Sequence, residues 1–166
     1  DFSEWQRALD AAFEVPLRGF WKCCYVPALT QSQVDHVVDA AERLPTPQSS
    51  ILIEHLHGAF GDTTEDTSAF PLRHARFGVL FSSRWREREL DAHCMGWARG
   101  GVANCDPAET AGAYSNYSFD GEARVARDLG RARIGSRLLR AKASYDPNNL
   151  LRLNHLGRSL ASAVQR

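Results

Sequence analysis

Apolar and polar residues follow two different periods along this chain. Short stretches that are rich in aromatic and β-branched residues alternate with a period of two, which predicts strands. Longer stretches place apolar residues three or four positions apart, which predicts amphipathic helices. The expected strands cover residues 19–26, 49–57, 73–83 and 113–119. The expected helices cover residues 2–12, 30–41, 86–99, 122–129 and 132–143, with a last short turn at 160–164.

Local signals mark where several of these elements begin and end. Thr30 and Gln33 have the spacing of a capping box, in which two side chains satisfy backbone amides at the start of a helix. The pair Gly100–Gly101 is expected to end the helix that precedes it. Pro147 is expected to end the last helix, because proline has no amide to donate and excludes the helical conformation from the residue before it.

The order of the elements indicates the fold class. It runs helix, strand, helix, two strands, helix, strand and then helices, which predicts an α+β fold. We expect an antiparallel β-sheet with helices covering one face. The length of 166 residues suits one compact domain, and no repeat or low-complexity linker divides the chain.

Composition excludes several function classes. Twenty basic and twenty acidic residues balance to a net charge of zero, so we expect no nucleic-acid partner. No apolar run has the length needed to cross a bilayer, so we expect no membrane contact. The first residues lack the basic and apolar regions of a signal peptide. The chain begins with Asp1 rather than methionine, which we interpret as a start part-way through a longer protein.

The four cysteines show no metal-binding or redox spacing. Cys23 and Cys24 are adjacent and would point to opposite faces of a strand, which argues against joint use as ligands. We interpret all four as small buried apolar residues in a reducing compartment, and therefore expect a cytoplasmic protein; a disulfide is the alternative.

A C-terminal motif carries the first resemblance to a known family. It comprises Arg137-Leu138, Lys142, Tyr145-Asp146-Pro147, Asn149-Leu150 and Arg152-Leu153-Asn154. This pattern resembles the C-terminal signature of the berberine bridge enzyme-like FAD-linked oxidases, particularly their bacterial branch. The resemblance implies that Asn154 lies near the isoalloxazine ring of FAD and contacts the cofactor. The alternative is that the turn at Asp146-Pro147 only ends the last helix and has no further role.

The segment from His57 to Arg73 resembles a glycine-rich loop of the same family. His57 stands where the family has a glycine, and Leu72 stands where it has a histidine, so a polar role at position 72 is lost. The plant branch also has an active-site glutamate on the following strand. Because no acidic residue lies between Arg73 and Trp85, we expect that base to be absent.

A third match, the segment from Tyr114 to Tyr117, resembles the family's Tyr-x-Asn-Tyr strand. On a strand, Asn116 shares a face with Tyr114 and Tyr117 points to the other face. The resemblance implies that Tyr117 is the catalytic base that takes a hydroxyl proton, with Tyr114 and Asn116 as substrate-binding residues. A phenol titrates near pH ~10, so this role needs a lowered pKa. The alternative is that both tyrosines are half-buried structural residues with hydrogen-bonded hydroxyls.

His55 and His57 are the one pair with a spacing that could bind a metal. They lie two apart on an expected strand, so they would share a face. No third ligand is spaced to join them, and a catalytic metal site needs at least three protein ligands. We therefore expect no metal.

The resemblance implies that residues 1–145 form an α+β substrate domain and that residues 146–166 return to a flavin-binding domain. No Gly-x-Gly-x-x-Gly or other phosphate cradle occurs in the chain, so we do not expect it to bind FAD alone. The implied function is the substrate-binding portion of an FAD-dependent oxidoreductase that oxidises an alcohol-bearing small molecule, a sugar or a secondary metabolite, with oxygen as acceptor. Its partners would be that substrate and a flavin-binding domain or subunit. The alternative is a free-standing, non-catalytic remnant that binds a small molecule or forms a homodimer.

Overall fold

The computed structural model describes residues 1–7, 10, 16–64, 67–68, 70, 72–103, 114–117 and 132–152. The expected helix at 122–129, the turn at 160–164 and Asn154 lie outside these residues. The α-helices are α1 (Phe2–Arg7), α3 (Gln31–Glu42), α4 (Asp91–Ala103) and α6 (Ala132–Tyr145). The strands are β1 (Arg18–Val26), β2 (Ser50–His55) and β3 (Phe77–Trp85). Three short 3-10 helices are η1 (Gly58–Phe60), η3 (Arg88–Leu90) and η4 (Ser115–Tyr117).

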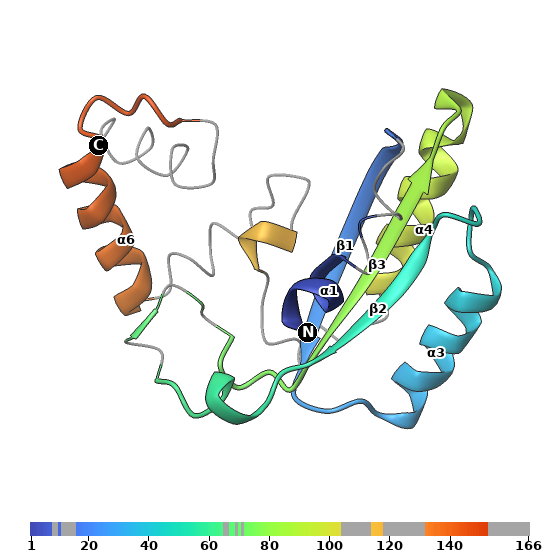
Figure 1. Cartoon of the computed structure of the whole chain (residues 1–166), viewed down its shortest axis with the longest axis horizontal. Helices are drawn as coiled ribbons and strands as arrows, with labels where there is room; N and C mark the ends of the chain where they lie inside the picture. Colours follow the sequence, from blue (N-terminus) through green and yellow to red (C-terminus); the bar gives the residue numbers. More distant parts are fainter. Residues whose placement is uncertain are drawn as a thin grey trace.

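The three strands form an antiparallel sheet in the order β1-β3-β2 (Figure 1). β3 therefore lies at the centre and pairs with both neighbours along its length. Helices α3 and α4 pack on the sheet, whereas α6 lies apart from it at the other side of the view (Figure 1). This arrangement confirms the predicted α+β fold with an antiparallel sheet.

The two faces of the sheet differ in burial. Residues of β3 alternate between buried and half-buried, so one face is covered and the other is partly open. The covered face packs against α4 and α3 through a core of apolar side chains: Phe20, Cys24, Ala40, Val79, Phe81, Trp85, Cys94 and Ala98. The open face carries half-buried residues that include Trp21, Cys23, Leu80 and Ser82.

Helix α4 lies unusually close to the sheet at Gly101. A Cβ at this position would lie 2.3 Å from Cδ1 of Phe81, so only glycine allows the helix backbone to rest on that ring. The predicted end of the helix at Gly100–Gly101 is therefore wrong. α4 continues to Ala103 because packing on Phe81 stabilises the helix through the two glycines, which overrides their low helix propensity.

The start of α4 is tied to two strands by one carboxylate. Asp91 Oδ1 accepts hydrogen bonds from Arg18 Nε at 2.6 Å and from Trp85 Nε1 at 2.7 Å. Its second oxygen, Oδ2, accepts from Arg18 Nη2 at 2.7 Å. A negative charge is also favourable at the N-terminus of a helix. Asp91 therefore fixes the N-terminal end of α4 against β1 and β3.

Other sequence predictions are confirmed or corrected by the structure. The capping box of Thr30 and Gln33 is present at the start of α3. The third strand begins at Phe77 rather than residue 73, because residues 72–75 form a hydrogen-bonded turn. The expectation that all four cysteines are thiols is wrong, because Cys24 is in a disulfide whose partner lies outside the described residues. Cys23 and Cys94 are free, so the cysteines no longer support a reducing compartment.

The described residues contain no helix that is long and apolar enough to cross a membrane.

We predict that Gly101→Ala destabilises the protein by about 1–3 kcal/mol, because the added methyl group overlaps the ring of Phe81. Gly100→Ala is the matched control, since a Cβ there meets nothing within 4 Å. The control should be neutral or stabilise by up to about 1 kcal/mol through helix propensity. Urea denaturation midpoints measure both effects, and equal midpoints for the two variants would contradict the close packing of α4.

We also predict that Asp91→Asn destabilises the protein at neutral pH and much less in acid. The hydrogen bond from Arg18 holds the pKa of Asp91 below its ordinary value of 3.8 in the folded protein. The stabilisation is therefore fully present above about pH 5 and is lost as the pH falls through the lowered pKa. Denaturation at pH 7 and at pH 3 tests this. Asp39→Asn is the control, because its ion pair with Arg43 is exposed and should matter little at either pH. A loss of stability by Asp91→Asn that is the same at both pH values would refute the linkage.

Candidate functional site

Tyr114, Asn116 and Tyr117 lie together, but not on a strand. Residues 115–117 form η4, and the amide of Tyr117 donates to the carbonyl of Tyr114 at 3.1 Å. The predicted strand is therefore wrong within the described part of 113–119. Because residues three apart eclipse in a 3-10 helix, the two tyrosine rings lie on the same side, with centroids 5.9 Å apart. On a strand they would have pointed to opposite faces.

The hydroxyl of Tyr117 donates a hydrogen bond to Oε1 of Glu54 at 2.8 Å. Glu54 belongs to β2, so this bond joins η4 to the open face of the sheet. Burial raises the pKa of Tyr117 to about 12, and the hydrogen bond to Glu54 adds to the effect. Tyr117 is therefore a protonated donor at neutral pH. Glu54 could not be predicted as a site residue from the sequence, because an acidic residue on a half-exposed strand gives no signal of this contact.

Two further titratable side chains border this pair from β1. Tyr25 is 2% exposed, and burial raises its pKa far above that of a free phenol. Burial also raises the pKa of the Cys23 thiol to about 12. The negative charge of Glu54 acts in the same direction on Cys23, Tyr25 and Tyr117. The Glu54 carboxylate is therefore surrounded by one thiol and two phenols, all of which stay protonated at neutral pH.

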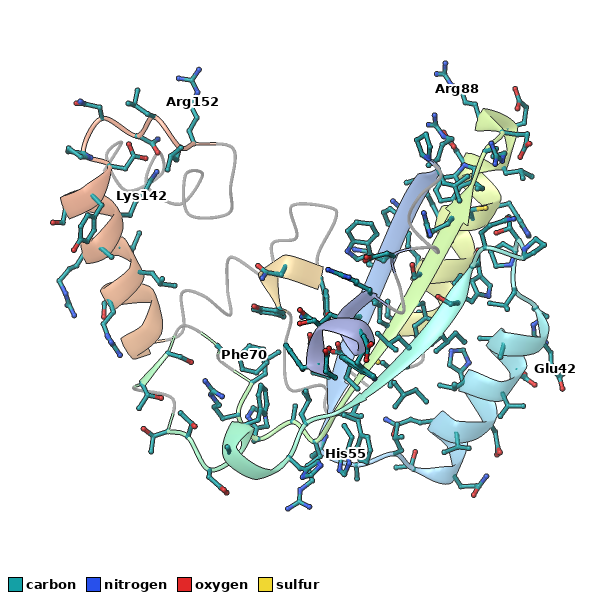
Figure 2. The ribbon with its side chains drawn as sticks, in the orientation of Figure 1. Glu42, His55, Phe70, Arg88, Lys142 and Arg152 are labelled. Carbon is teal, nitrogen blue, oxygen red and sulfur yellow. The ribbon has the colours of Figure 1, made fainter. Side chains whose placement is uncertain are left out.

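An aromatic wall supports the two tyrosines from the loop that precedes β3. The ring of Phe70 lies 4.9 Å from Tyr114 and 4.9 Å from Phe60 in edge-to-face contacts. Arg73 lies over the Phe60 and Phe70 rings, at 5.0 and 5.4 Å, and donates to the carbonyl of Phe60 at 2.9 Å. Figure 2 shows Phe70 between the central η4 and the end of the sheet marked by His55.

Leu72 has a packing role at the position where the resemblance would place a polar histidine. This residue stands where the resemblance would place a histidine, and it is 1% exposed. It packs with Tyr25 and Ala75 in a buried cluster that Tyr114 and Tyr117 also contact. The Leu72 side chain is therefore part of the apolar cluster on which Tyr114 and Tyr117 pack.

Asn116 is exposed and its amide donates to the hydroxyl of Tyr114 at 2.9 Å. A polar amide and two phenols thus lie within one short segment, where they could bind a hydroxylated ligand. Asn154, the residue expected to contact the cofactor, lies outside the described residues.

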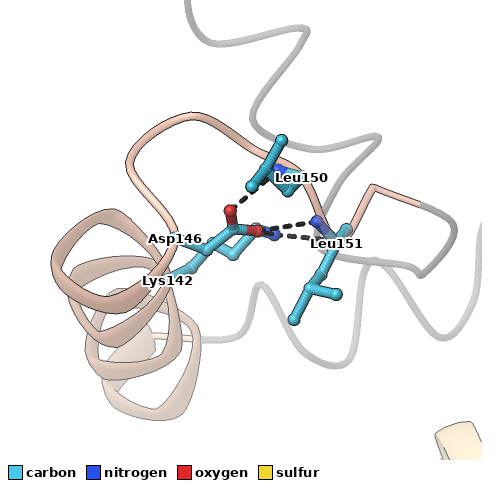
Figure 3. A network of polar contacts seen from close by, with 4 residues as sticks. All are labelled: Lys142, Asp146, Leu150 and Leu151. Carbon is cyan, nitrogen blue, oxygen red and sulfur yellow. Dashed lines mark hydrogen bonds and ion pairs between the residues drawn. The ribbon is translucent and has the colours of Figure 1, made fainter.

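The corner after α6 is held by a compact polar network (Figure 3). Lys142 forms an ion pair with Asp146, and the two side chains are 8% and 10% exposed. Asp146 also accepts from the amides of Leu150 at 2.7 Å and Leu151 at 3.0 Å. Lys142 donates to the carbonyl of Leu151 at 2.8 Å. The predicted helix stop is thus a rigid turn, in which the hydrogen bond from Lys142 lowers the pKa of Asp146.

The same corner exposes apolar side chains. Tyr145 is 90% exposed, Leu150 77% and Leu151 71%. Such a group of large apolar residues on a rigid turn is typical of a surface that contacts another protein segment. The corner lies away from η4 in the view of Figure 1, so the described residues do not bring it to the tyrosines.

The histidine pair does not extend into a metal centre. The rings of His55 and His57 lie 4.3 Å apart, and His55 also stacks on Phe77 at 4.9 Å. Within the part of the chain that the structure describes, no three histidine, cysteine or acidic side chains gather as metal ligands.

The sheet and its helices define a fold that is also found in oxidoreductases. The chain matches the structure of GilR, an oxidoreductase that catalyses the terminal step of gilvocarcin biosynthesis, in complex with pregilvocarcin. The TM-score is 0.63 at 23% sequence identity, over 80% of this chain and 31% of that one. It also matches glycopeptide hexose oxidase DBV29 complexed with teicoplanin, with a TM-score of 0.61 at 21% identity. That match covers 85% of this chain and 31% of DBV29.

This chain therefore spans about a third of the length of these two proteins. No family model and no curated protein sequence matches it. At such identities the likeness shows the fold alone, an α+β fold that this chain shares with part of each of these two proteins.

Proposed function

We propose that this chain is the substrate-binding part of an FAD-dependent oxidoreductase of the berberine bridge enzyme-like type, which oxidises an alcohol-bearing small molecule and passes electrons to oxygen. The hydrogen bond from Tyr117 to Glu54 at the edge of an open sheet face is the observation that carries this proposal. The fold shared with two oxidoreductases supports it, as does the coverage of about a third of their chains.

The described residues fit one half of a flavin enzyme's site. A proton acceptor lies beside a half-buried sheet face, where a substrate could lie between this domain and a cofactor. The sequence contains no glycine-rich cradle for the cofactor's pyrophosphate, so we expect another domain or subunit to hold FAD. A bound flavin would supply the hydride acceptor. The exposed apolar corner at Tyr145, Leu150 and Leu151 is a suitable surface for that domain.

Glu54 and Tyr117, which we call the acid–phenol pair, can together remove a proton from a substrate hydroxyl without forming a free phenolate. The oxygen of Tyr117 accepts the proton of the substrate hydroxyl while its own proton moves to Oε1 of Glu54. The proton thus ends on the carboxylate, and the substrate oxygen is free to become a carbonyl as hydride leaves its carbon. The route avoids a free phenolate, which burial and the neighbouring Glu54 disfavour because they raise the pKa of Tyr117 to about 12. Tyr114 and Asn116 would orient the substrate.

Colour is the first test of the proposal. The protein purified under native conditions from the cells that make it should show flavin absorption bands. The isolated 166-residue chain mixed with FAD should not reduce the flavin when an alcohol is added, because half a cofactor site cannot position the ring. A colourless native protein that gains no flavin on reconstitution, and that elutes as a dimer, would instead support a non-catalytic, self-associating remnant.

Two substitutions test the roles of the pair. In the flavin-loaded protein we predict that Tyr117→Phe and Glu54→Gln each lower the rate of alcohol-dependent flavin reduction by about 10²–10⁴-fold. The double variant should lose little more than either single variant, because the two groups act as one unit. Glu42→Gln is the matched control for Glu54→Gln, since Glu42 is exposed and lies at the end of α3, away from the Tyr117–Glu54 pair (Figure 2). Rates that stay within a few-fold of the parent in both single variants would refute the assignment.

A further inference from the structure

The central strand carries a glycine at the point where the acid–phenol pair meets the sheet. Gly78 of β3 lies directly opposite Tyr25 of β1 and directly opposite Glu54 of β2. Glycine weakens the interior of a strand, because it adds backbone entropy to the unfolded chain and contributes no packing. Gly78 is the second residue of β3 and is paired on both sides, so a glycine there indicates that another group needs the space above its Cα.

The groups that occupy this space are the side chains of its two cross-strand neighbours. A Cβ at Gly78 would lie 3.1 Å from Cε1 of Tyr25 and 3.2 Å from Oε2 of Glu54. Both distances are shorter than an ordinary carbon contact of about 3.5–4.0 Å. The ring from one side and the carboxylate from the other thus converge over the backbone of the central strand, and any larger residue would push one of them away.

This convergence fixes both oxygens of Glu54. Oε2 lies 3.2 Å from the place that a Cβ of residue 78 would occupy, while Oε1 accepts the hydrogen bond from Tyr117 at 2.8 Å. The ring of Tyr25 is almost fully buried, so it cannot yield to a new methyl group without disturbing its own packing. The carboxylate is half-buried and is the group that would move.

We propose that Gly78 is a positioning residue for the Tyr117–Glu54 pair: its missing side chain lets the carboxylate lie across the central strand and reach the phenol. The geometric claim concerns this chain alone, and its consequence for catalysis rests on the proposed function.

The protonation of Tyr117 reports this geometry. The titratable groups that face it are Glu54 from β2, Cys23 and Tyr25 from β1, and Tyr114 from its own segment. After burial, the hydrogen bond to Glu54 is the strongest cause that raises the pKa of Tyr117 to about 12. If the carboxylate moves away, the pKa of Tyr117 falls towards the value of a free phenol, about 10.

The experiment compares Gly78→Ala with Gly19→Ala in the isolated chain. Gly19 is the matched control because it also lies in a strand on the open face, and a Cβ there meets only ordinary contacts at 3.7 Å or more. Each variant carries 3-fluorotyrosine at position 117, so that its titration is followed by fluorine NMR at moderate pH. Gly78→Ala should lower the pKa of the labelled residue relative to the parent, and Gly19→Ala should leave it unchanged. A folded Gly78→Ala protein with the parent's pKa would overturn the proposal.

A stability cycle covers the case in which Gly78→Ala does not fold. Glu54→Ala removes the carboxylate, so adding Gly78→Ala to it should destabilise the chain less than adding Gly78→Ala to the parent. The contact of the added methyl group with Tyr25 is the same in both backgrounds, so equal losses of stability would show that Glu54 does not need this space.

Activity separates this proposal from the proposed function. In the flavin-loaded protein Gly78→Ala should lower kcat at least tenfold with little change in KM, whereas Gly19→Ala should leave both unchanged. If Gly78→Ala lowers the pKa of Tyr117 but leaves kcat unchanged, Gly78 positions the pair and the proposed catalytic role of the pair is wrong. If Gly78→Ala leaves the pKa of Tyr117 unchanged and Tyr117→Phe is inactive, the catalytic role of Tyr117 is supported and the positioning role of Gly78 is wrong.

Discussion

The whole structure depends on how closely other groups approach the central strand β3. On the covered face, Gly101 lets helix α4 rest on the ring of Phe81. On the open face, Gly78 leaves room for Tyr25 and Glu54. Each glycine leaves out a side chain where another group must come near: Gly101 lets α4 approach β3, and Gly78 gives room to residues of β1 and β2 in the same sheet. The same strand is therefore both the base of the core and the base of the candidate site.

The regular elements could be predicted because their signals are local. The alternation in β1 and the capping box of Thr30 and Gln33 depend on residues within one or two turns. The end of α4 could not be predicted in this way. Gly100–Gly101 is a helix breaker by propensity, and only the contact with Phe81, twenty residues earlier in the chain, makes Gly101 the residue that the helix requires.

The tyrosine segment shows the same limit. Residues 114–117 alternate like a strand, yet their tyrosines are three apart, which is also the spacing that a 3-10 turn brings to one side. Glu54 was missed for a topological reason. The resemblance places an acidic residue after Arg73, on β3, where this chain has none. The strand order β1-β3-β2 places β2 beside β3, so a carboxylate sixty-three positions before Tyr117 reaches its hydroxyl.

The electrostatics of the site favour one direction of proton movement. Cys23, Tyr25 and Tyr117 are all harder to ionise than their free side chains, because burial and the nearby carboxylate both oppose a second negative charge. A phenolate at position 117 would have to form beside the very group that repels it. A proton that enters through the Tyr117 hydroxyl therefore has one acceptor in this cluster, the Glu54 carboxylate. In the proposed reaction Tyr117 would therefore carry the proton to Glu54, because a phenol with a raised pKa is a poor base alone.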